Sequence, residues 1–293
     1  NPTSAALLTA RGDLERRRGD FAAAQATYEE ALAHDPTASG AAASLSLLFT
    51  QRGDPAAALT IAQAAVNAAP LAGEGWVLLG NVRRSQGDLP GALAAYRQAI
   101  VVAGGFLDAY LALADALTVS GLPDEASAVL AQGLQAAPGP ELLTALGNLA
   151  ARQPDPQPSA AAQFTAALAS DQTFIAAHIG LAAAEALAGH PAAQMAQLRQ
   201  AVALNPASAW ARTALASALR SQGAWPQAET TFKEALTIEP LYTAGYTGLA
   251  TAYLARGERD AAWSVLQAAA GVAPADAVVQ TAIGQWYQHG ARY

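Results

Sequence analysis

A repeat of 34 residues runs along the whole chain, and this regularity limits the possible folds more than any other feature of the sequence. Counted from Ala5, later units begin at residues 39, 73, 107, 141, 175, 209 and 243, and a ninth begins at residue 277. A chain that repeats one small unit stacks neighbouring units into a solenoid. We therefore expect one extended array over residues 1–293, a scaffold rather than a catalytic globule.

Three types of residue recur at fixed positions of the 34-residue unit. The fifteenth position holds Asp155 in the fifth unit and glycine in the other seven, namely Gly19, Gly53, Gly87, Gly121, Gly189, Gly223 and Gly257. Glycine adopts positive φ without strain, which indicates a turn. Small residues, mostly alanine, recur at positions 20 and 27, where they let two helices approach closely. Proline recurs at position 32 and ends a helix. Each unit is therefore predicted to be a helix, a tight turn and a second helix.

This pattern resembles the tetratricopeptide repeat, which has a bulky residue and Leu-Gly in its first helix, helix A, and Ala, an aromatic residue and Ala in its second helix, helix B. The third unit matches best, with Trp76, Leu79, Gly80, Ala92, Tyr96 and Ala99. The resemblance covers the whole chain. It implies an all-α fold, a right-handed α-α superhelix, but its motif residues are packing residues and indicate little about activity.

The fifth unit departs from the pattern. Its glycine comes one position early, at Gly147, and its turn contains Pro154, Pro156 and Pro158. Because small rotations between neighbours set the shape of a solenoid, one irregular unit can bend the array. We expect a hinge at this unit, residues 141–174, although the same prolines could stiffen the loop.

Both ends of the chain fall within the repeat. Asn1-Pro2 matches positions 31 and 32 of a preceding unit, and residues 278–289 match helix A of a ninth unit. The sequence is therefore expected to be a fragment of a longer array that ends in a terminal helix from residue 277.

Composition disfavours several classes of protein. The net charge of −7 and the pI near 5.0 argue against binding nucleic acid, which needs a basic face. Apolar runs are shorter than the roughly 20 residues that span a bilayer, so we expect no direct membrane insertion. The absence of cysteine fits a periplasm or a cytosol, and the periplasm is slightly favoured. Fifteen arginines against the single Lys233 are typical of a GC-rich bacterial genome.

No catalytic pattern is visible. The histidines His34, His178, His190 and His289 lie in different units, without a second ligand at metal-binding spacing. We therefore expect no enzymatic activity, no metal and no cofactor. The recurring Gly-Asp pairs are interpreted as turns in which the aspartate caps helix B.

The resemblance implies that helix A lines a concave groove through positions 2, 5, 9, 12 and 13, and that a protein or peptide partner binds there. The predicted partner-binding residues are Arg16, Arg84, Leu111, Leu142, Leu149, Arg152, Ile179, Trp210 and Arg220. Leu142 and Leu149 are expected to be exposed on this face. Replacing both by aspartate should then abolish partner binding and leave the helices intact.

Arginine occupies position 12 in alternate units, as Arg16, Arg84, Arg152 and Arg220. Such a row could bind a long ligand that carries carboxylates or hydroxyls. The simpler interpretation is four solvated residues near helix C-termini, where the helix dipole favours a cation. Two well-known binding modes of the family are unsupported, because position 5 holds no lysine and position 6 no asparagine.

We favour a non-catalytic scaffold that binds a partner protein along the groove. The alternative is a periplasmic structural segment of a bacterial exopolysaccharide export complex. The chain looks like the alanine-rich arrays of bacterial cellulose exporters, which link the cellulose synthase to an outer-membrane pore, and export components would then be its partners. The targeting array of an enzyme is a third, less favoured possibility.

Overall fold

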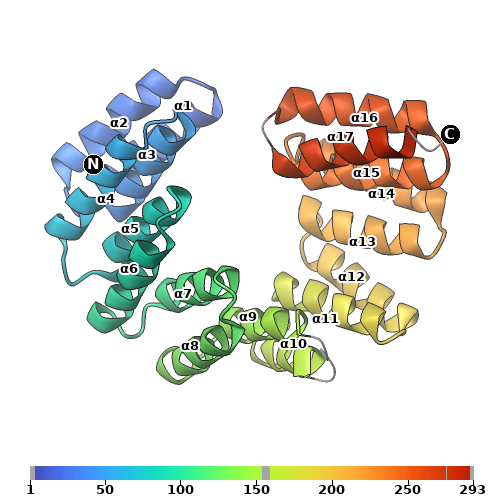
Figure 1. Ribbon diagram of the computed structural model, residues 1–293, viewed down its shortest axis with the longest axis horizontal. Coiled ribbons are helices and arrows are strands. Elements are labelled where there is room, and N and C mark those ends of the chain that lie inside the picture. Colours follow the sequence, from blue (N-terminus) through green and yellow to red (C-terminus); the bar gives the residue numbers. More distant parts are fainter. Residues whose placement is uncertain (1–3, 154–158, 275, 291–293) are drawn as a thin grey trace. The chain divides into compact units, whose positions relative to one another are not determined.

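The computed structural model describes residues 4–153, 159–274 and 276–290, and every regular element in these residues is an α-helix. The helices are α1 (Ala5–Arg17), α2 (Phe21–His34), α3 (Ser39–Gln51), α4 (Pro55–Ala68), α5 (Gly73–Ser85), α6 (Leu89–Val102), α7 (Leu107–Val119), α8 (Pro123–Ala136), α9 (Pro140–Ala150), α10 (Ser159–Ser170), α11 (Ile175–Leu187), α12 (Pro191–Leu204), α13 (Ala209–Ser221), α14 (Trp225–Ile238), α15 (Thr243–Ala255), α16 (Arg259–Val272) and α17 (Ala277–Gly290). The predicted all-α class is confirmed (Figure 1).

The helix boundaries follow the period of the sequence. Helix A begins at residues 5, 39, 73, 107, 175, 209, 243 and 277, where the 34-residue count places it. The fifth repeat differs, because α9 begins one residue early, at Pro140, and ends at Ala150. This shift of one residue changes which side chains α9 buries.

The chain divides into two compact units, Asn1–Leu149 (unit 1) and Ala150–Tyr293 (unit 2), and each is described by itself. The boundary falls within the fifth repeat, where a hinge is predicted. The hinge and the single continuous array both stay predictions, and Pro154, Pro156 and Pro158 lie outside the described residues.

The turn within each repeat has one geometry. The seven predicted turn glycines all have positive φ, between 74° and 81°. At Gly53 this conformation lets the amide of Asp54 donate to the carbonyl of Phe49 at 2.9 Å, which ends α3. The Asp54 carboxylate then accepts a hydrogen bond from the amide of Ala57 at 3.0 Å and caps α4. Asp20 and Asp88 cap α2 and α6 in the same way, so the predicted role of the Gly-Asp pairs is confirmed.

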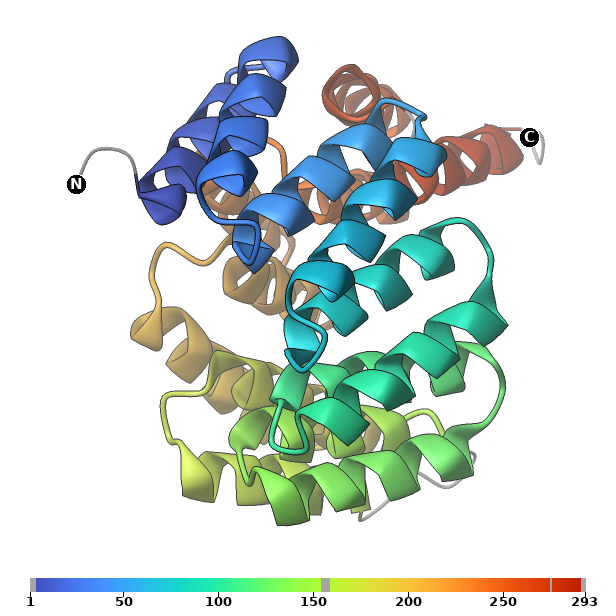
Figure 2. The ribbon, with the colours of Figure 1, turned by 90° about the vertical axis from the view of Figure 1, so that its left-hand side faces the viewer.

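In unit 1, the two helices of each of the first four repeats pack together, and α2, α4 and α6 also contact the next helix A. Successive A helices touch as well, α1 with α3, α3 with α5 and α5 with α7. Within the described residues, no such contact joins one helix B to the next. The A helices therefore form the inner row of the stack. Figure 2 shows these pairs following one another in chain order, from blue to green.

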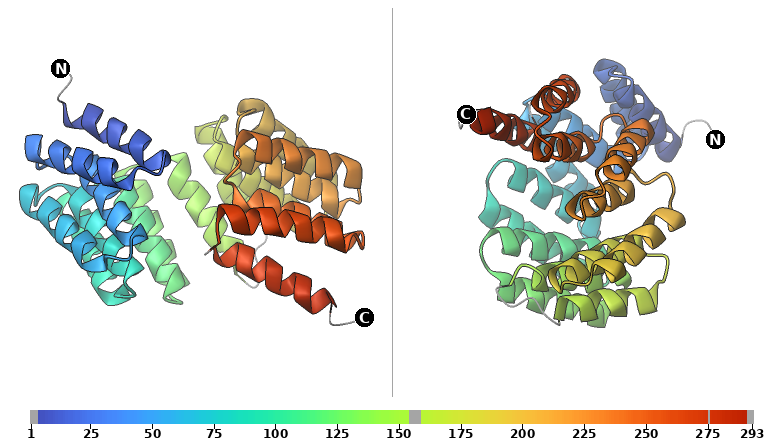
Figure 3. Two further views of the ribbon diagram at one scale, coloured as in Figure 1. Left: turned by 90° about the horizontal axis from the view of Figure 1, so that it is seen from above. Right: turned by 90° about the vertical axis from the view of Figure 1, so that its right-hand side faces the viewer.

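Unit 2 repeats this arrangement. Its A helices α11, α13, α15 and α17 contact one another in order, and the B helices α12, α14 and α16 lie between them in sequence (Figure 3, right). Within the described residues, no helix has both the length and the hydropathy of a membrane span.

In the first, third, fifth and seventh repeats, an aromatic ring lies in the core between small residues. Position 24 of these repeats holds Tyr28, Tyr96, Phe164 and Phe232, and all four are fully buried. The other four repeats have Ala62, Leu130, Leu198 and Leu266 at this position, and these are buried as well. A Cβ atom added at Gly12 would lie 2.5 Å from the nearest ring carbon of Tyr28, so only glycine fits against that ring. The predicted packing role of the small residues explains why alanine dominates the sequence.

A hydrogen bond that the sequence analysis did not anticipate closes the loop between repeats. The side chain at position 4 of helix A donates to the carbonyl six residues earlier. The bond is made by Trp76, Tyr110, His178, Arg212, Tyr246 and Gln280, at 2.9, 2.7, 3.0, 3.0, 3.0 and 2.7 Å respectively. The acceptor is the carbonyl at position 32 of the preceding repeat, so each bond ties two repeats together.

Candidate partner-binding surface

The inner surface of unit 1 is formed by the exposed side chains of α1, α3, α5 and α7. A hollow of about 230 Å³ lies on it between α3 and α5. Its walls include Ala43, Leu47 and Leu78, and Asn81 and Ser85 add polar groups. The Leu47 side chain is 45% exposed, which is high for a leucine beside a hollow. An apolar hollow with a few polar groups at its edge is the usual form of a ligand site.

The polar residues of this surface are held in place by tyrosines of helix B. The Tyr28 hydroxyl donates to Asp13 at 2.7 Å, and Ser44 donates to the same carboxylate oxygen at 3.1 Å. The Tyr96 hydroxyl donates to the Asn81 side-chain oxygen at 2.8 Å. Burial raises the pKa of Tyr28, the hydrogen bond to Asp13 raises it further, and burial raises the pKa of Tyr96. Both hydroxyls therefore stay protonated and orient polar groups on the inner surface.

The arginines at position 12 do not form one equivalent set. Arg84 of α5 forms an ion pair with Asp115 of α7, so its charge is compensated. Arg152 follows the end of α9, so its predicted place on helix A is wrong. Arg16 lies in unit 1 and Arg220 in unit 2, and each has a buried Nε atom without a partner in the described residues. A row of four that binds one ligand stays a prediction.

Leu142 and Leu149 are buried, at 0% and 7% exposed, so the prediction that they face a partner is wrong. Both belong to the core of unit 1, with Leu113, Leu117 and Leu130. The cause is the early start of α9, which puts the two leucines at the third and tenth positions of the helix. In repeats two to four and six to eight those positions are buried as well, as at Leu48 and Val82.

The other predicted apolar residues differ in exposure. Leu111 and Ile179 are half-buried and pack against the cores of their units. Trp210, at position 2 of α13, is 44% exposed. Whether these three residues contact a partner stays a prediction.

The inner surface of unit 2 is formed by α11, α13, α15 and α17. A hollow of about 370 Å³ lies between α15 and α17, and none of the residues that line it is charged. Thr247, Thr251 and Thr281 present hydroxyls there, and Gln285 presents an amide. The hollow is therefore uncharged, with hydroxyl and amide groups among apolar side chains.

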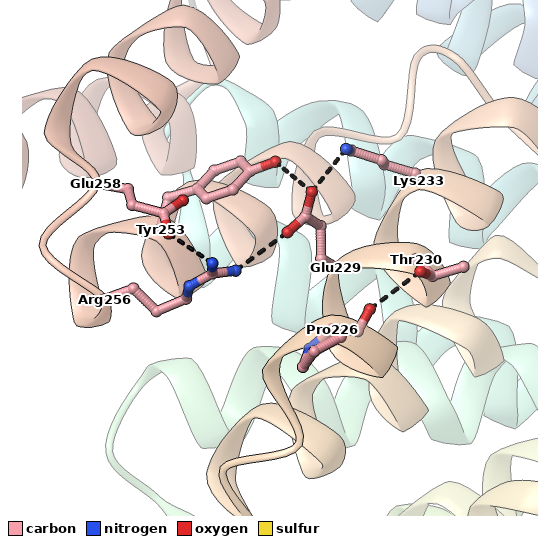
Figure 4. Close-up of polar contacts among 7 residues, drawn as sticks. All are labelled: Pro226, Glu229, Thr230, Lys233, Tyr253, Arg256 and Glu258. Atoms are coloured by element: carbon pink, nitrogen blue, oxygen red, sulfur yellow. Dashed lines mark hydrogen bonds and ion pairs between the residues drawn. The ribbon is translucent and has the colours of Figure 1, made fainter.

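A charged network joins α14 to α15 in unit 2 (Figure 4). Glu229 accepts hydrogen bonds from Lys233 at 2.7 Å, Tyr253 at 2.8 Å and Arg256 at 3.1 Å. The hydrogen bonds from Lys233 and then Tyr253 hold the pKa of Glu229 below its usual value. Arg256 also pairs with Glu258 at 2.6 Å. Since every partner is a residue of the same unit, the network stabilises the stack.

A second contact between neighbouring repeats is made by the side chain at position 14, which is Arg256 in the eighth repeat. Arg52 donates to Gln25 at 2.8 Å, and Gln86 donates to the carbonyl of Pro55 at 2.7 Å. Both partners lie on helix B of the preceding repeat, as Glu229 does for Arg256. Side chains at the end of helix A therefore reach back across the repeat interface.

Two of the four histidines have structural partners. His178 is buried at 7% exposed, and its Nε2 donates to the carbonyl of Gln172 at 3.0 Å. His190 forms a hydrogen bond with Glu185 at 2.8 Å. Over residues 4–153, 159–274 and 276–290, no three histidine or carboxylate side chains lie close enough to hold a metal ion.

Leu47 is not among the binding residues predicted from the sequence, although it occupies position 9, one of the groove positions. Polar side chains such as Asp13 and Asn81 hold the same position in neighbouring repeats, so the column does not look apolar. Thr281 and Gln285 were missed because they lie in the ninth, incomplete repeat. In each case the repeat position, which is visible in the sequence, is the signal that could have found the residue.

Two family models, both described as tetratricopeptide repeat, match the sequence. One matches residues 9–72 and 47–106, and the other matches residues 83–149 and 219–285. The chain belongs to the tetratricopeptide repeat family. Among curated proteins, no sequence relative of this tetratricopeptide repeat protein is found.

Solved structures agree with this assignment. A tetratricopeptide repeat protein from Parabacteroides merdae ATCC 43184 superposes with a TM-score of 0.61 at 20% identity, over 85% of this chain and 98% of that chain. A chain of the APC/C hetero-tetramer Cut9-Hcn1 superposes with a TM-score of 0.59 at 15% identity, over 96% of this chain. This tetratricopeptide repeat chain spans only 55% of that longer one. At such identities the likeness concerns the fold alone.

Proposed function

We propose that the protein is a non-catalytic scaffold that binds a partner protein on the inner surface of its A helices. The observation that carries this proposal is the hollow between α3 and α5, beside the half-exposed Leu47. Val119 adds a second exposed apolar side chain to the inner surface of unit 1, 68% exposed at the end of α7. Exposed apolar groups around a concavity favour contact with another protein.

The family supports the same function, since the tetratricopeptide repeat is a fold for protein interaction. Its motif residues here are used in packing: Tyr96 and Ala99 are fully buried. Binding must therefore depend on the variable positions of helix A, such as Leu47 and Asn81, which differ from repeat to repeat.

The test replaces Leu47 and Val119 by aspartate. The protein is purified from the cells that produce it, and the proteins that copurify are quantified by mass spectrometry. A partner retained by the wild type should be lost from the double variant, because two carboxylates would be desolvated at the interface.

The matched control replaces Leu71 and Val101 by aspartate. These residues are 79% and 76% exposed and lie outside the inner surface, in a loop and at the end of α6. The control should retain the partner. A partner that both double variants retain equally would contradict binding on the inner surface.

A structural role in exopolysaccharide export is the second candidate. The alanine-rich array and the arginine bias, typical of a GC-rich bacterial genome, are the features that favour it. The sequence that flanks this chain in its gene tests the idea. A signal peptide and a C-terminal run of alternating β-strands would favour a periplasmic export protein, and a catalytic domain would contradict it.

A further inference from the structure

The residues that line the hollow between α15 and α17 are all uncharged, and they include three threonines and a glutamine. Position 5 of two successive A helices supplies Thr247 and Thr281, and position 9 supplies Thr251 and Gln285. Ala277, Ala282 and the 56% exposed Val278 form its apolar part. A charged ligand would lose hydration here and gain no opposite charge.

Two of the threonine hydroxyls can act only as hydrogen-bond acceptors toward a ligand. Thr251 donates to the carbonyl of Thr247 at 2.7 Å, and Thr281 donates to the carbonyl of Ala277 at 2.7 Å. A hydroxyl has one proton and two acceptor sites, so a threonine that donates within its own helix offers only lone pairs to a ligand. The ligand must therefore supply hydrogen-bond donors to these two positions.

The Gln285 amide complements the hydroxyls, because it carries two N–H donors as well as an acceptor oxygen. The hollow thus offers acceptors at the threonines and a donor at the glutamine. A peptide main chain has the matching groups, an N–H and a C=O in each residue, and carries no charge.

The spacing of the repeat also suits an extended chain. Neighbouring packed helices lie about 8 to 10 Å apart, and an extended peptide advances about 3.3 Å per residue. Thr247 and Thr281 occupy the same position on neighbouring A helices, so about three residues of an extended chain would separate the groups that meet them. Thr213 of α13 has the same repeat position but is only 8% exposed, so the set of available hydroxyls begins at α15.

From these observations we propose that the hollow between α15 and α17 binds the main chain of an uncharged, extended segment of the partner protein. This inference rests on the proposed scaffold function and names the chemistry of one contact. It depends on unit 2 alone, whereas the test with Leu47 and Val119 depends on unit 1.

The experiment measures binding of an acetylated and amidated nine-residue peptide, (Asn-Val-Thr)₃, by titration followed in amide NMR spectra of the protein. The resonances of Thr251 and Thr281 should shift. Versions with glutamate or lysine in place of asparagine should bind more weakly. A version with N-methylated amides should lose binding, since it lacks the N–H donors.

Replacing Thr251 and Thr281 by valine keeps the shape of the side chains and removes the acceptors. The double variant should bind the peptide roughly five- to 150-fold more weakly, because it loses two hydrogen bonds of about 0.5 to 1.5 kcal/mol each. The control replaces Thr230 and Thr237 of α14, which make the same bond to their own helix at 3.0 and 2.9 Å, and should bind like the wild type.

Three results would overturn the inference: no binding of the neutral peptide, stronger binding of the glutamate peptide, or unchanged binding by the valine double variant. A melting curve for each variant shows whether unit 2 is still folded. If the neutral peptide fails but the partner is still lost from the Leu47 and Val119 variant, the scaffold function stands and only this contact is wrong.

Discussion

Leu142 provides a direct test of the corrected register of α9. Its side chain is fully buried in the core of unit 1, beside Leu113 and Leu117. Replacing it by alanine removes three carbon atoms, which costs about 2.4 kcal/mol at about 0.8 kcal/mol per buried methylene. The cavity left behind adds to this loss, since measured Leu→Ala changes in cores cost about 2.7 to 5 kcal/mol. We expect a loss of about 3 kcal/mol.

The control is Leu47→Ala on the inner surface. Leu47 is 45% exposed and borders open space, so truncation removes less buried surface and leaves no closed cavity; the loss should be about 1 kcal/mol or less. Because repeats of a stack can open locally, the free energy of opening is measured by hydrogen exchange of the α7 and α8 amides, beside urea unfolding.

The result distinguishes the two possible registers of α9. If Leu142→Ala costs no more than Leu47→Ala, then Leu142 lies at the surface, as a fixed 34-residue count predicts, and the shifted register is wrong. A large loss for Leu142→Ala also explains any loss of partner binding in that variant as unfolding rather than as a lost contact.

Three further substitutions test the repeat architecture. Gly87→Ala should cost about 1 kcal/mol in urea unfolding, because φ is 81° at this residue. The control Gly271→Ala lies in α16 with nothing within 4 Å of the new methyl group, and it should be neutral or stabilise the helix by up to about 1 kcal/mol. Equal effects of the two substitutions would refute the turn geometry. Tyr246→Phe removes the hydroxyl that donates to the Pro240 carbonyl at 3.0 Å and should cost up to about 1 kcal/mol, and no change in the melting of unit 2 would show that the bond between repeats adds nothing. Glu229 has a pKa below its ordinary 4.5 in the folded state, so its contribution to the free energy of unfolding is present above pH 4.5 and is lost as the pH falls through the lower, folded pKa. Glu229→Gln should therefore flatten the acid limb of the stability curve, whereas Glu239→Gln should not.

Features that depend on one residue type at one position were predictable from the sequence. The turn at Gly53 needs positive φ and the cap at Asp54 needs a short acceptor, so each position reveals its role. The helix starts follow from the same local signals. Their repetition along the chain explains why the period and the all-α class were predicted correctly.

Features that depend on neighbouring helices were not predictable in the same way. Gly147 signals the shift of α9, but a fixed count assigns Leu142 and Leu149 to exposed columns all the same. The ion pair between Arg84 and Asp115 joins position 12 of one repeat to position 9 of the next, so a search along one column finds only the arginine.

The hydrogen bond from the side chain at position 4 to the carbonyl six residues earlier could not be predicted for another reason. Trp76, Tyr246 and Gln280 differ in size, charge and hydropathy, so the column looks variable. They share only a donor group at the end of a long side chain, which reaches a carbonyl six residues earlier. Patterns based on apolar periodicity do not detect a shared donor.

Site-specific photo-crosslinking tests the central claim, that the partner lies on the inner surface of the A helices. A photoreactive phenylalanine analogue is placed at Leu47, on the inner surface, or at Val101, at the end of the B helix α6, in the cells that produce the protein. We predict that irradiation joins a second protein to the Leu47 variant and not to the Val101 variant. The same crosslinked protein from Val101, with none from Leu47, would contradict the claim.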